Sequence, residues 1–422
     1  MTDVIYVGGK VYVITRAEGS NTTPANYGTY ASGGTDDKGV LATNFNASLK
    51  NNMIQIYTLG GGRSFKQIVP GKFEASGTLE YEVGSGNFLK YAFGAVSAGA
   101  TTTTNFDGTT ITGTPTAALK KYVLTQADTL DSFSMDVIAQ SDASASDVKT
   151  RYTGAKANQV TLKADTENPL HATMDFIAQK PTTSTADYSA TTQTILSDVP
   201  QMFYRGQLLI NAGDYGLSGT GTLSTMTDAT KAWTVNAWQT NYVLIDSAGT
   251  AFVITSNTAT ALTVTGTPAT GSYVICPLST YTSAQVVQCN SVDMTLTNNL
   301  EGYWSISNDT GRGVKYLLEK QREYTLTLDL NFVNTDQLGR FYSGATSGTT
   351  PVSDTGYTPF CVVLDYKTAI GQGDNYKALK LVFTDVVFDE ESLPANPKDI
   401  LKQVVTAKAK NCMGFFITSE AQ

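Results

Sequence analysis

Two acidic side chains two positions apart are the first residues in this sequence whose types and spacing could carry out chemistry. Glu80 and Glu82 would lie on the same face of a strand, about 7 Å apart. A pair of carboxylates at a short separation can hydrolyse a glycosidic bond. Nothing in the neighbouring sequence indicates an aromatic cleft for a sugar, so we interpret the pair as part of a solvated sheet face.

The other candidate groups also lack the spacing that a reaction or a bound ion requires. The single histidine, His171, argues against a Ser-His-Asp triad and a histidine metal site, and we interpret it as an edge residue of a strand. The acidic run at 385–391 lacks the DxDxDG loop that binds calcium, and the GGGR run at 60–63 has no following helix and no GK[ST] for a phosphate. No CxxC spacing joins the four cysteines, Cys276, Cys289, Cys361 and Cys412. We therefore expect no enzyme: no catalytic residue, no cofactor and no metal ion.

Composition favours an ordered all-β protein. Only 16% of the 422 residues are charged, whereas 22 tyrosines, 17 phenylalanines and 37 glycines accompany many threonines. Aromatic and β-branched residues suit a pleated surface. The 37 acidic residues outnumber the 29 basic ones, for a net charge of −8, and no basic cluster is present to grip nucleic acid. The opening MTDVIYVGG lacks the pattern of a secretory signal, and no apolar run is long enough for a membrane span, so we expect neither.

Alternating runs predict strands with one wet face and one buried face. Residues 73–83 place apolar or small side chains at odd positions and mostly polar ones at even positions, and residues 324–332 alternate in the same way. Helical periodicity is rare. Residues 87–94 and 336–342 could each form two turns, the second capped by Asn334 or Thr335.

An internal repeat organises these elements. SLKNNM at 48–53 matches TLTNNL 247 positions later, and the alternating strand recurs 249 positions later. Each copy then runs into its short helix and a Gly-Ala pair. Residues 159–165 also resemble 385–391, more weakly. We interpret the chain as two copies of one β domain.

The second copy carries an insertion. Residues 5–8 resemble 203–206 at an offset of 198, so the jump to 247 places about 49 extra residues in the first loop of copy two. The inserted segment, 219–277, contains four or five short expected strands and two tryptophans. Copy one has instead a polar loop, 18–38, of a length that is usually functional or disordered. The expected domains are 1–190, then 191–218 with 278–422, and the small β module 219–277.

In this order, several stretches resemble the tail tube proteins of long-tailed double-stranded DNA phages and related archaeal viruses. The resemblance covers most of the chain outside 219–277 and rests on residues 131–136, 151–162, 200–206, 291–300 and 320–328. The inserted segment resembles a small β module, with the pattern DATKAW at 228–233, that occurs as an addition in phage structural proteins.

The resemblance implies an all-β fold of two tandem tail-tube-type β-sandwich domains, each with a short flanking helix, plus the inserted module. Single-domain members form hexameric rings that stack into a conduit for genome ejection. A duplicated chain would form a trimeric ring with pseudo-sixfold symmetry. The implied partners are further copies of the chain and other tail proteins (tail terminator, tape measure, and baseplate or tip), with DNA passing through unbound and no membrane. The implied location is the virion tail, and the host cytoplasm during assembly.

Two sets of residues follow as candidates within that assembly. One polar face of each alternating strand would face an acidic lumen: Thr78, Glu80, Glu82, Thr327, Asp329 and Asn331. The long loop of copy one would make contacts between rings: Glu18, Asn21, Tyr27, Tyr30, Asp36 and Lys38. The inserted module would decorate the outside, and we expect tubes to form without it.

Two other classes of protein share part of this sequence character. A β-rich adhesin or fibre-like protein that binds a host surface would also be rich in threonine and glycine, but it would form monomers or slender trimers. A secreted enzyme acting on glycosides would need a signal and a carboxylate site, and neither is indicated. Negative-stain microscopy distinguishes hollow tubes or rings from rods and single particles.

Overall fold

The structure is a computed structural model. It describes residues 11–18, 38–40, 42–59, 63–84, 86–106, 110–111, 118–140, 147–186, 200–278, 286–305, 311–353, 356–366, 378–394 and 401–418. The fold is all-β, as the composition predicts, with two short α-helices among the described residues. No helix in these ranges is long and apolar enough to cross a bilayer.

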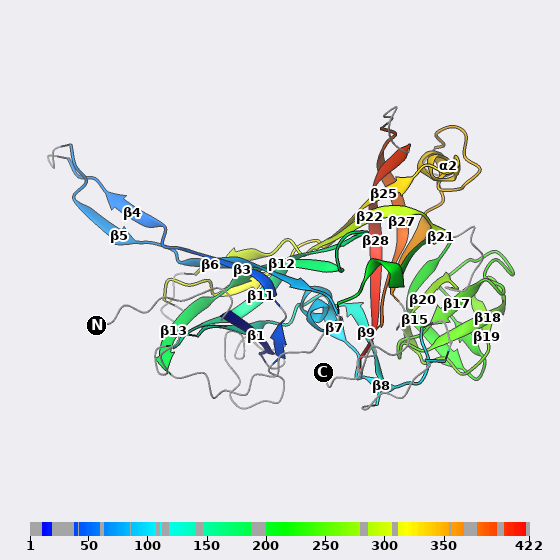
Figure 1. Ribbon diagram of the computed structural model, residues 1–422, viewed down its shortest axis with the longest axis horizontal. Helices are drawn as coiled ribbons and strands as arrows, with labels where there is room; N and C mark the ends of the chain where they lie inside the picture. The colour runs from blue at the N-terminus through cyan, green and yellow to red at the C-terminus, as the bar shows by residue number, and fades with distance from the viewer. Residues whose placement is uncertain are drawn as a thin grey trace.

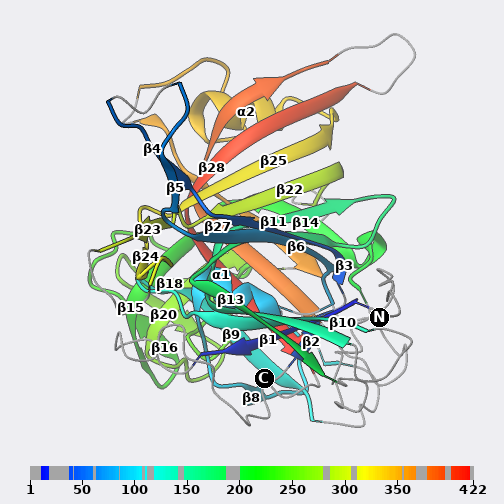
Figure 2. The ribbon, with the colours of Figure 1, turned by 90° about the vertical axis from the view of Figure 1, so that its left-hand side faces the viewer.

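Eight antiparallel strands form one continuous sheet, which we call the wall. Their order is β3 (Ala42–Lys50), β6 (Glu74–Glu82), β12 (His171–Ala178), β11 (Asp147–Asp165), β22 (Cys289–Thr297), β25 (Glu323–Asn331), β28 (Lys402–Thr418) and β27 (Ala378–Ser392). Figure 2 shows β6, β11, β22, β25 and β28 following one another across this face. The first four strands come from the first half of the chain and the last four from the second half.

Three long wall strands continue into an outer layer. The first part of β11 pairs with β10 (Phe133–Ala139) and β13 (Lys180–Ala186), and β10 pairs with β1 (Val11–Ala17), which pairs with β2 (Lys38–Val40). The first part of β27 pairs with β26 (Phe360–Tyr366), which pairs with β14 (Gly206–Asn211), and β14 pairs with β21 (Val286–Val287). The last part of β28 pairs with β9 (Lys120–Gln126), flanked by β7 (Gly94–Val96) and β8 (Ala100–Thr101). The sheet therefore folds over one large apolar core that spans both halves of the chain.

Both predicted helices are present. A 3-10 turn, η2 (Asn87–Leu89), leads into α1 (Lys90–Phe93), and α2 (Asp336–Ser343) is its counterpart in the second half. Each helix ends at a glycine in the left-handed region, Gly94 (φ 95°) and Gly344 (φ 77°), which a side chain would strain. Thr335 occupies the N-cap position without a capping side-chain hydrogen bond.

The two Asn-Asn stretches that match in the sequence form similar turns in the structure. Asn52 and Asn299 both have positive φ, and their side-chain amides donate to the carbonyls of Lys72 and Gln321, which are themselves 249 residues apart. Asparagine tolerates this region better than most residues. The tight Asn-Asn turn therefore has a backbone reason to recur.

The register corrects one sequence match. Both β11 and β27 carry a bulge opposite the neighbouring strand, at Asn158 and Asp389. Aligning the bulges makes residues 159–161 equivalent to 390–392, an offset of 231, rather than 159–165 equivalent to 385–391. The short apolar motif in this part of the sequence is too common in strands to fix the register.

Each half of the chain projects a hairpin from the same end of the wall. In the first half β4 (Met53–Ile56) pairs with β5 (Gln67–Pro70), and in the second half β23 (Glu301–Tyr303) pairs with β24 (Tyr316–Leu318). The first hairpin extends far from the body (Figure 1). At its base the Phe73 amide donates to the Arg312 carbonyl at 2.9 Å, and the Lys72 ammonium lies 4.4 Å from the centre of the Trp304 ring.

The inserted segment folds as a closed barrel that begins at Asp214 rather than Gly219. Its strands are β15 (Asp214–Thr222), β16 (Thr225–Thr227), β17 (Tyr242–Ile245), β18 (Ala251–Asn257), β19 (Ala261–Val264) and β20 (Gly271–Pro277). Trp233, Trp238 and Tyr273 fill its centre. A 3-10 turn, η3 (Phe203–Arg205), precedes β14 on the way into this part of the chain.

Candidate functional surface: the polar face of the wall

The six residues predicted for a lumen share one face of the wall. On β6, Thr78, Glu80 and Glu82 are half-buried, whereas the intervening Leu79 and Tyr81 are buried. Thr327, Asp329 and Asn331 alternate in the same way with the buried side chains of β25. The alternation in the sequence thus separates a polar face from the face on the core.

Polar side chains continue this face across the neighbouring strands in register. Thr173, Thr161, Thr295 and Thr325 stand opposite one another on four consecutive strands. The hydroxyls of Thr161 and Thr295 lie 3.1 Å apart, across the junction between the two halves of the chain. Hydroxyls offer neutral hydrogen-bonding groups without a fixed charge.

A charged cluster lies on the first half of this face. His171, on β12, faces β6, where its Nδ1 is 3.2 Å from Glu82 and its Nε2 is 3.9 Å from Glu80. Asn44 donates to Glu80 at 3.3 Å, and Thr78 donates to Asp175 at 2.7 Å. The two carboxylates therefore hold a histidine between them, and this arrangement fits a sheet surface better than a pair acting on a sugar.

The matching cluster on the second half is held by a lysine and an amide. Lys402 lies 3.5 Å from Asp329, and Asn290 donates to Asn331 at 3.0 Å.

Two neighbouring carboxylates on this face have shifted pKa values. Desolvation raises the pKa of Asp293, the charge of Lys163 lowers it and that of Asp165 raises it, and the net shift is upward. Desolvation also raises the pKa of Asp165, but hydrogen bonds from Asn168 and Glu167 together with Lys163 outweigh it and lower the pKa.

Carboxylates outnumber cations on this face. The register places nine carboxylates there, and a tenth, Asp389, lies 2.9 Å from Lys408 on the same face, against six lysines and His171. The nine carboxylates belong to Glu74, Glu80, Glu82, Asp165, Asp175, Asp293, Glu323, Asp329 and Glu390. The lysines are Lys50, Lys156, Lys163, Lys402, Lys408 and Lys410. Within the described ranges, no group of three or more histidines, cysteines or acidic residues has the arrangement of a metal site.

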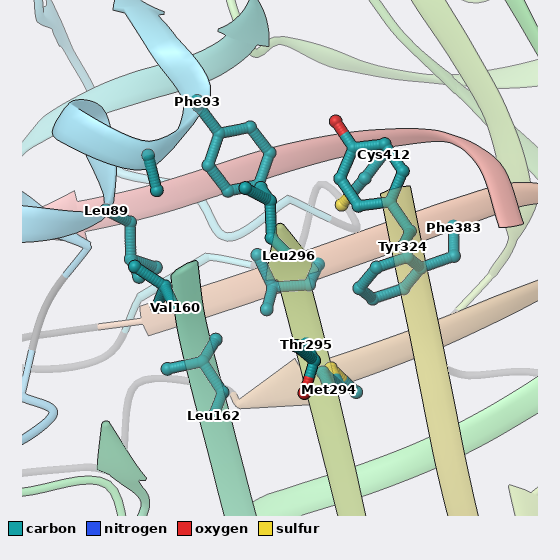
Figure 3. A pocket seen from close by; sticks show the side chains of 12 residues that line it. Leu89, Phe93, Val160, Leu162, Met294, Thr295, Leu296, Tyr324, Phe383 and Cys412 are labelled. Atoms are coloured by element: carbon teal, nitrogen blue, oxygen red, sulfur yellow. The ribbon is translucent and has the colours of Figure 1, made fainter. Parts of the chain in front are cut away.

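Beneath the polar face, the junction of β11 with β22 is closely packed. Val160 and Leu162 on β11 meet Met294 and Leu296 on β22 around a cavity of about 20 Å³, which helix α1 covers with Phe93 (Figure 3). Asn298 is buried at the same place and donates to the carbonyls of Ala92 and Ala157. The two halves of the chain are therefore joined by a continuous sheet and a shared core.

The residues predicted for contacts between rings fall mostly outside the described residues. Asn21, Tyr27, Tyr30 and Asp36 lie there. Lys38 begins strand β2. Glu18 is buried, and its carboxylate accepts hydrogen bonds from the hydroxyls of Ser132 and Ser134 and from the Gly154 amide. Its side chain therefore joins β1 to β10 and β11.

A model of the family described as phage tail tube protein matches residues 16–377. The chain belongs to the phage tail tube protein family. No curated protein matches it. Membership in the tail tube family gives the chain a structural role in the virion tail, in self-assembly and in contact with other tail proteins. The resemblance drawn from the sequence is thereby confirmed.

Two parts of this tail tube protein were missed by sequence reasoning. One is the junction between the halves, where Asn158 accepts hydrogen bonds from the backbone amides of Asn298 and Leu300. The other is the projecting hairpin at 53–70. The recurrence of Asn-Asn before each hairpin was a signal for the turn, but nothing in it shows which strand lies alongside.

Proposed function

We propose that three copies of this tail tube protein close a pseudo-sixfold ring, with the polar face of the wall lining the lumen. One observation supports this most directly. Residues at equivalent positions in the two halves of the chain are buried where the other half lies beside them and exposed where it does not. Leu296, at the internal junction, is 7% exposed, but its equivalent Leu49, on the outer edge of β3, is 52% exposed. Leu162 is 5% exposed, and its equivalent Leu393, just after β27, is 43% exposed.

The two outer edges of the wall are therefore complementary. In the described residues β3 pairs on one side only, with β6, and the last part of β27 pairs on one side only, with β28. A heterologous contact that repeats the internal junction would join β27 of one chain to β3 of the next and close a ring. Such closure leaves no free sheet edge in the wall.

The internal register predicts the residue pairs of this contact. Gln159 stands opposite Thr297 inside the chain, so the equivalent Glu390 would stand opposite Lys50 of the next copy. Both are exposed in the single chain. Asn158 accepts a hydrogen bond from the Leu300 amide at 2.9 Å, and Asp389 would accept one from the Met53 amide of the next copy. Opposite charges facing each other across a strand pair are stabilising.

A charge exchange tests this contact. Lys50→Glu alone and Glu390→Lys alone would each place like charges opposite one another and should weaken ring formation at least tenfold in protein concentration. The double variant restores opposite charges and should recover rings. Native mass spectrometry and analytical ultracentrifugation give the number of chains in each particle.

The matched control is Glu323→Lys, on the same face but on a strand that is paired along both edges. It should leave ring formation unchanged. Recovery in the double variant with loss in both single variants supports the contact. Single variants that assemble like the unmodified chain, or an unmodified chain that stays a monomer, would overturn it.

The acidic face supplies the second part of the proposal. A lumen with more carboxylates than lysines repels phosphates, so DNA could pass through it without being held. The polar loop 18–38 remains a proposed contact between rings. The tail terminator, the tape measure and the baseplate or tip proteins remain the proposed partners, with assembly in the host cytoplasm.

A further inference from the structure

The contact inside the chain and the proposed contact between copies differ in chemistry on the side that faces the core. We call the pairing of β11 with β22 the internal seam, and the proposed pairing of β27 with β3 of the next copy the intermolecular seam. Val160 stands opposite Met174 as Glu391 stands opposite Val405, so β11 and β12 are equivalent to β27 and β28 at an offset of 231 residues. Three buried apolar residues at the internal seam thereby correspond to polar ones at the intermolecular seam. The pairs are Val160 with Glu391, Ala172 with Gln403, and Phe383 with Tyr152.

Two of these positions share one cavity. Val160 and Phe383 line the cavity of about 20 Å³ beneath the internal seam, and Figure 3 shows them on two sides of it. Val160 belongs to the first half of the chain and Phe383 to the second. Their equivalents at the intermolecular seam would therefore come from different copies, Glu391 from one and Tyr152 from the next. Glutamate and tyrosine are longer than valine and phenylalanine, so both side chains would extend further into such a cavity.

Glu391 lacks a donor for one of its oxygens in the single chain. Its Oε1 accepts a hydrogen bond from the side-chain amide of the buried Gln403. Its Oε2 is buried and has no hydrogen-bond partner among the described residues. Desolvation raises the pKa of Glu391 and the hydrogen bond from Gln403 lowers it, with a net upward shift. Because a buried carboxylate oxygen without a donor is costly, coverage of this edge by another copy calls for a donor from that copy.

Tyr152 has a donor to offer. Its ring is buried, with its centre 6.0 Å from that of Phe45 and 5.9 Å from that of Phe176. Its hydroxyl makes no hydrogen bond to the described part of the chain. Desolvation raises the pKa of Tyr152, so the hydroxyl keeps its proton at neutral pH. A protonated phenol can donate one hydrogen bond, and the equivalent Phe383 has none to give.

We infer that the Tyr152 hydroxyl of one copy donates a hydrogen bond to Oε2 of Glu391 of the preceding copy in the ring. The inference rests on the proposed ring assembly and names a residue pair that makes its seam selective. An edge that offered phenylalanine at this place would leave the carboxylate without a donor. The pair lies on the core side of the wall, whereas Lys50 and Glu390 face each other on the polar side, so the two contacts can be tested separately.

Removal of the donor is the first test. Tyr152→Phe takes away no hydrogen bond within the described part of the single chain, so the thermal unfolding of dilute, unassembled protein should be unchanged. Ring formation should require about tenfold more protein, measured by analytical ultracentrifugation, because Oε2 of Glu391 is then buried without a donor. The matched control is Tyr81→Phe in the same half of the chain. Its hydroxyl is also buried without a partner among the described residues, and its ring packs against Phe88. This control should leave ring formation unchanged.

Transfer of the internal set of residues is the second test. Glu391→Val with Gln403→Ala leaves the Tyr152 hydroxyl without an acceptor and should also weaken ring formation. Adding Tyr152→Phe gives the intermolecular seam the three residue types of the internal seam. Because replacement of both partners of a buried hydrogen bond by apolar groups is nearly neutral, the triple variant should form rings at close to the unmodified protein concentration.

The outcomes separate this contact from the ring itself. An unmodified chain that forms no rings contradicts the ring assembly and this contact with it. Rings that respond to the exchange of Lys50 and Glu390 but not to Tyr152→Phe contradict the contact alone, as do losses that simply add in the triple variant. Cryo-electron microscopy of the rings gives a direct measure. An oxygen–oxygen distance of about 2.5–3.0 Å between Tyr152 and Glu391 of adjacent copies supports the hydrogen bond, and side chains that point apart overturn it.

Discussion

At the scale of single residues, the inserted barrel is organised by two carboxylates. Asp228 accepts hydrogen bonds from the backbone and hydroxyl of Thr230 and from the Tyr273 hydroxyl at 2.8 Å. Asp214 accepts from Lys231 at 2.8 Å and from the indole of Trp233 at 2.6 Å. The DATKAW pattern therefore has a physical basis, because its first, third, fourth and sixth residues all take part in these two sites.

The Asp228 site predicts acid sensitivity of the barrel. Desolvation raises the pKa of Asp228, but the hydrogen bonds from Thr230 and Tyr273 together with Lys231 outweigh it and lower the pKa below its ordinary value. The carboxylate thus stabilises the fold above the unfolded pKa, near 3.9, and that stability is lost as the pH falls through the folded pKa. We expect Asp228→Asn to cost about 1–3 kcal/mol at pH 7 and to flatten the pH dependence.

Tryptophan fluorescence during thermal unfolding between pH 7 and pH 3 measures this effect, because Trp233 and Trp238 lie in the barrel. Glu167→Gln, on an exposed turn outside the barrel, serves as the control. An Asp228→Asn chain that keeps the pH dependence of the unmodified chain would contradict the assignment.

At the scale of elements, the sequence predicts strands and helices better than their partners. The alternation of β6 and β25 and the two helices could be predicted from the sequence, because each pattern depends on neighbours within a few residues. The course of the 19-residue β11, which leaves the outer layer after Ala155 and enters the wall at Lys156, could not be predicted. Its pairing with β22 depends on packing between halves far apart in the sequence. The hairpin of β4 and β5 carries neighbouring apolar residues that would favour burial, so only the structure shows that its side chains are almost all exposed.

The polar face of β6 gives the next prediction. In Glu80→Lys with Glu82→Lys, the two positions around His171 become cationic, so the face attracts phosphates instead of repelling them. Both side chains lie outside the apolar core, and tubes should still assemble. DNA ejection from particles that carry these tubes should slow several-fold, and more strongly at low salt.

Fluorescent detection of DNA release follows the ejection rate. The control is Asp128→Lys, which makes a charge reversal at an exposed turn between β9 and β10, outside the wall strands. Equal ejection rates in the two variants and in the unmodified particle would show that this face does not line the lumen.

At the scale of the whole molecule, the inserted barrel is part of the body rather than an attachment to it. Val243, Ile245 and Val274 of the barrel share an apolar cluster with Val363 and Phe415 of the outer layer, all at 0% exposure. The sequence treats the segment as separable because its length and its own tryptophans are those of a small domain. The side of β17 and β20 that meets the outer layer cannot be identified from an apolar run alone.

This shared cluster changes the expectation for a chain without the barrel. Joining Gly213 to Leu278 would expose Val363, Phe415 and their neighbours to water, at about 25 cal/mol per Å² of uncovered apolar surface. A patch of that kind promotes association in the wrong geometry. The shortened chain should therefore collect in the insoluble fraction, whereas Leu223→Asn with Val235→Ser, at exposed positions of the barrel, should leave soluble protein and tubes unchanged. Asparagine suits the positive φ of residue 223.

Sedimentation and negative-stain microscopy measure the solubility and assembly of the shortened chain. Soluble shortened chains that build normal tubes would mean that the barrel only decorates the outside. Insoluble shortened chains would mean that the body needs the barrel to cover this apolar cluster.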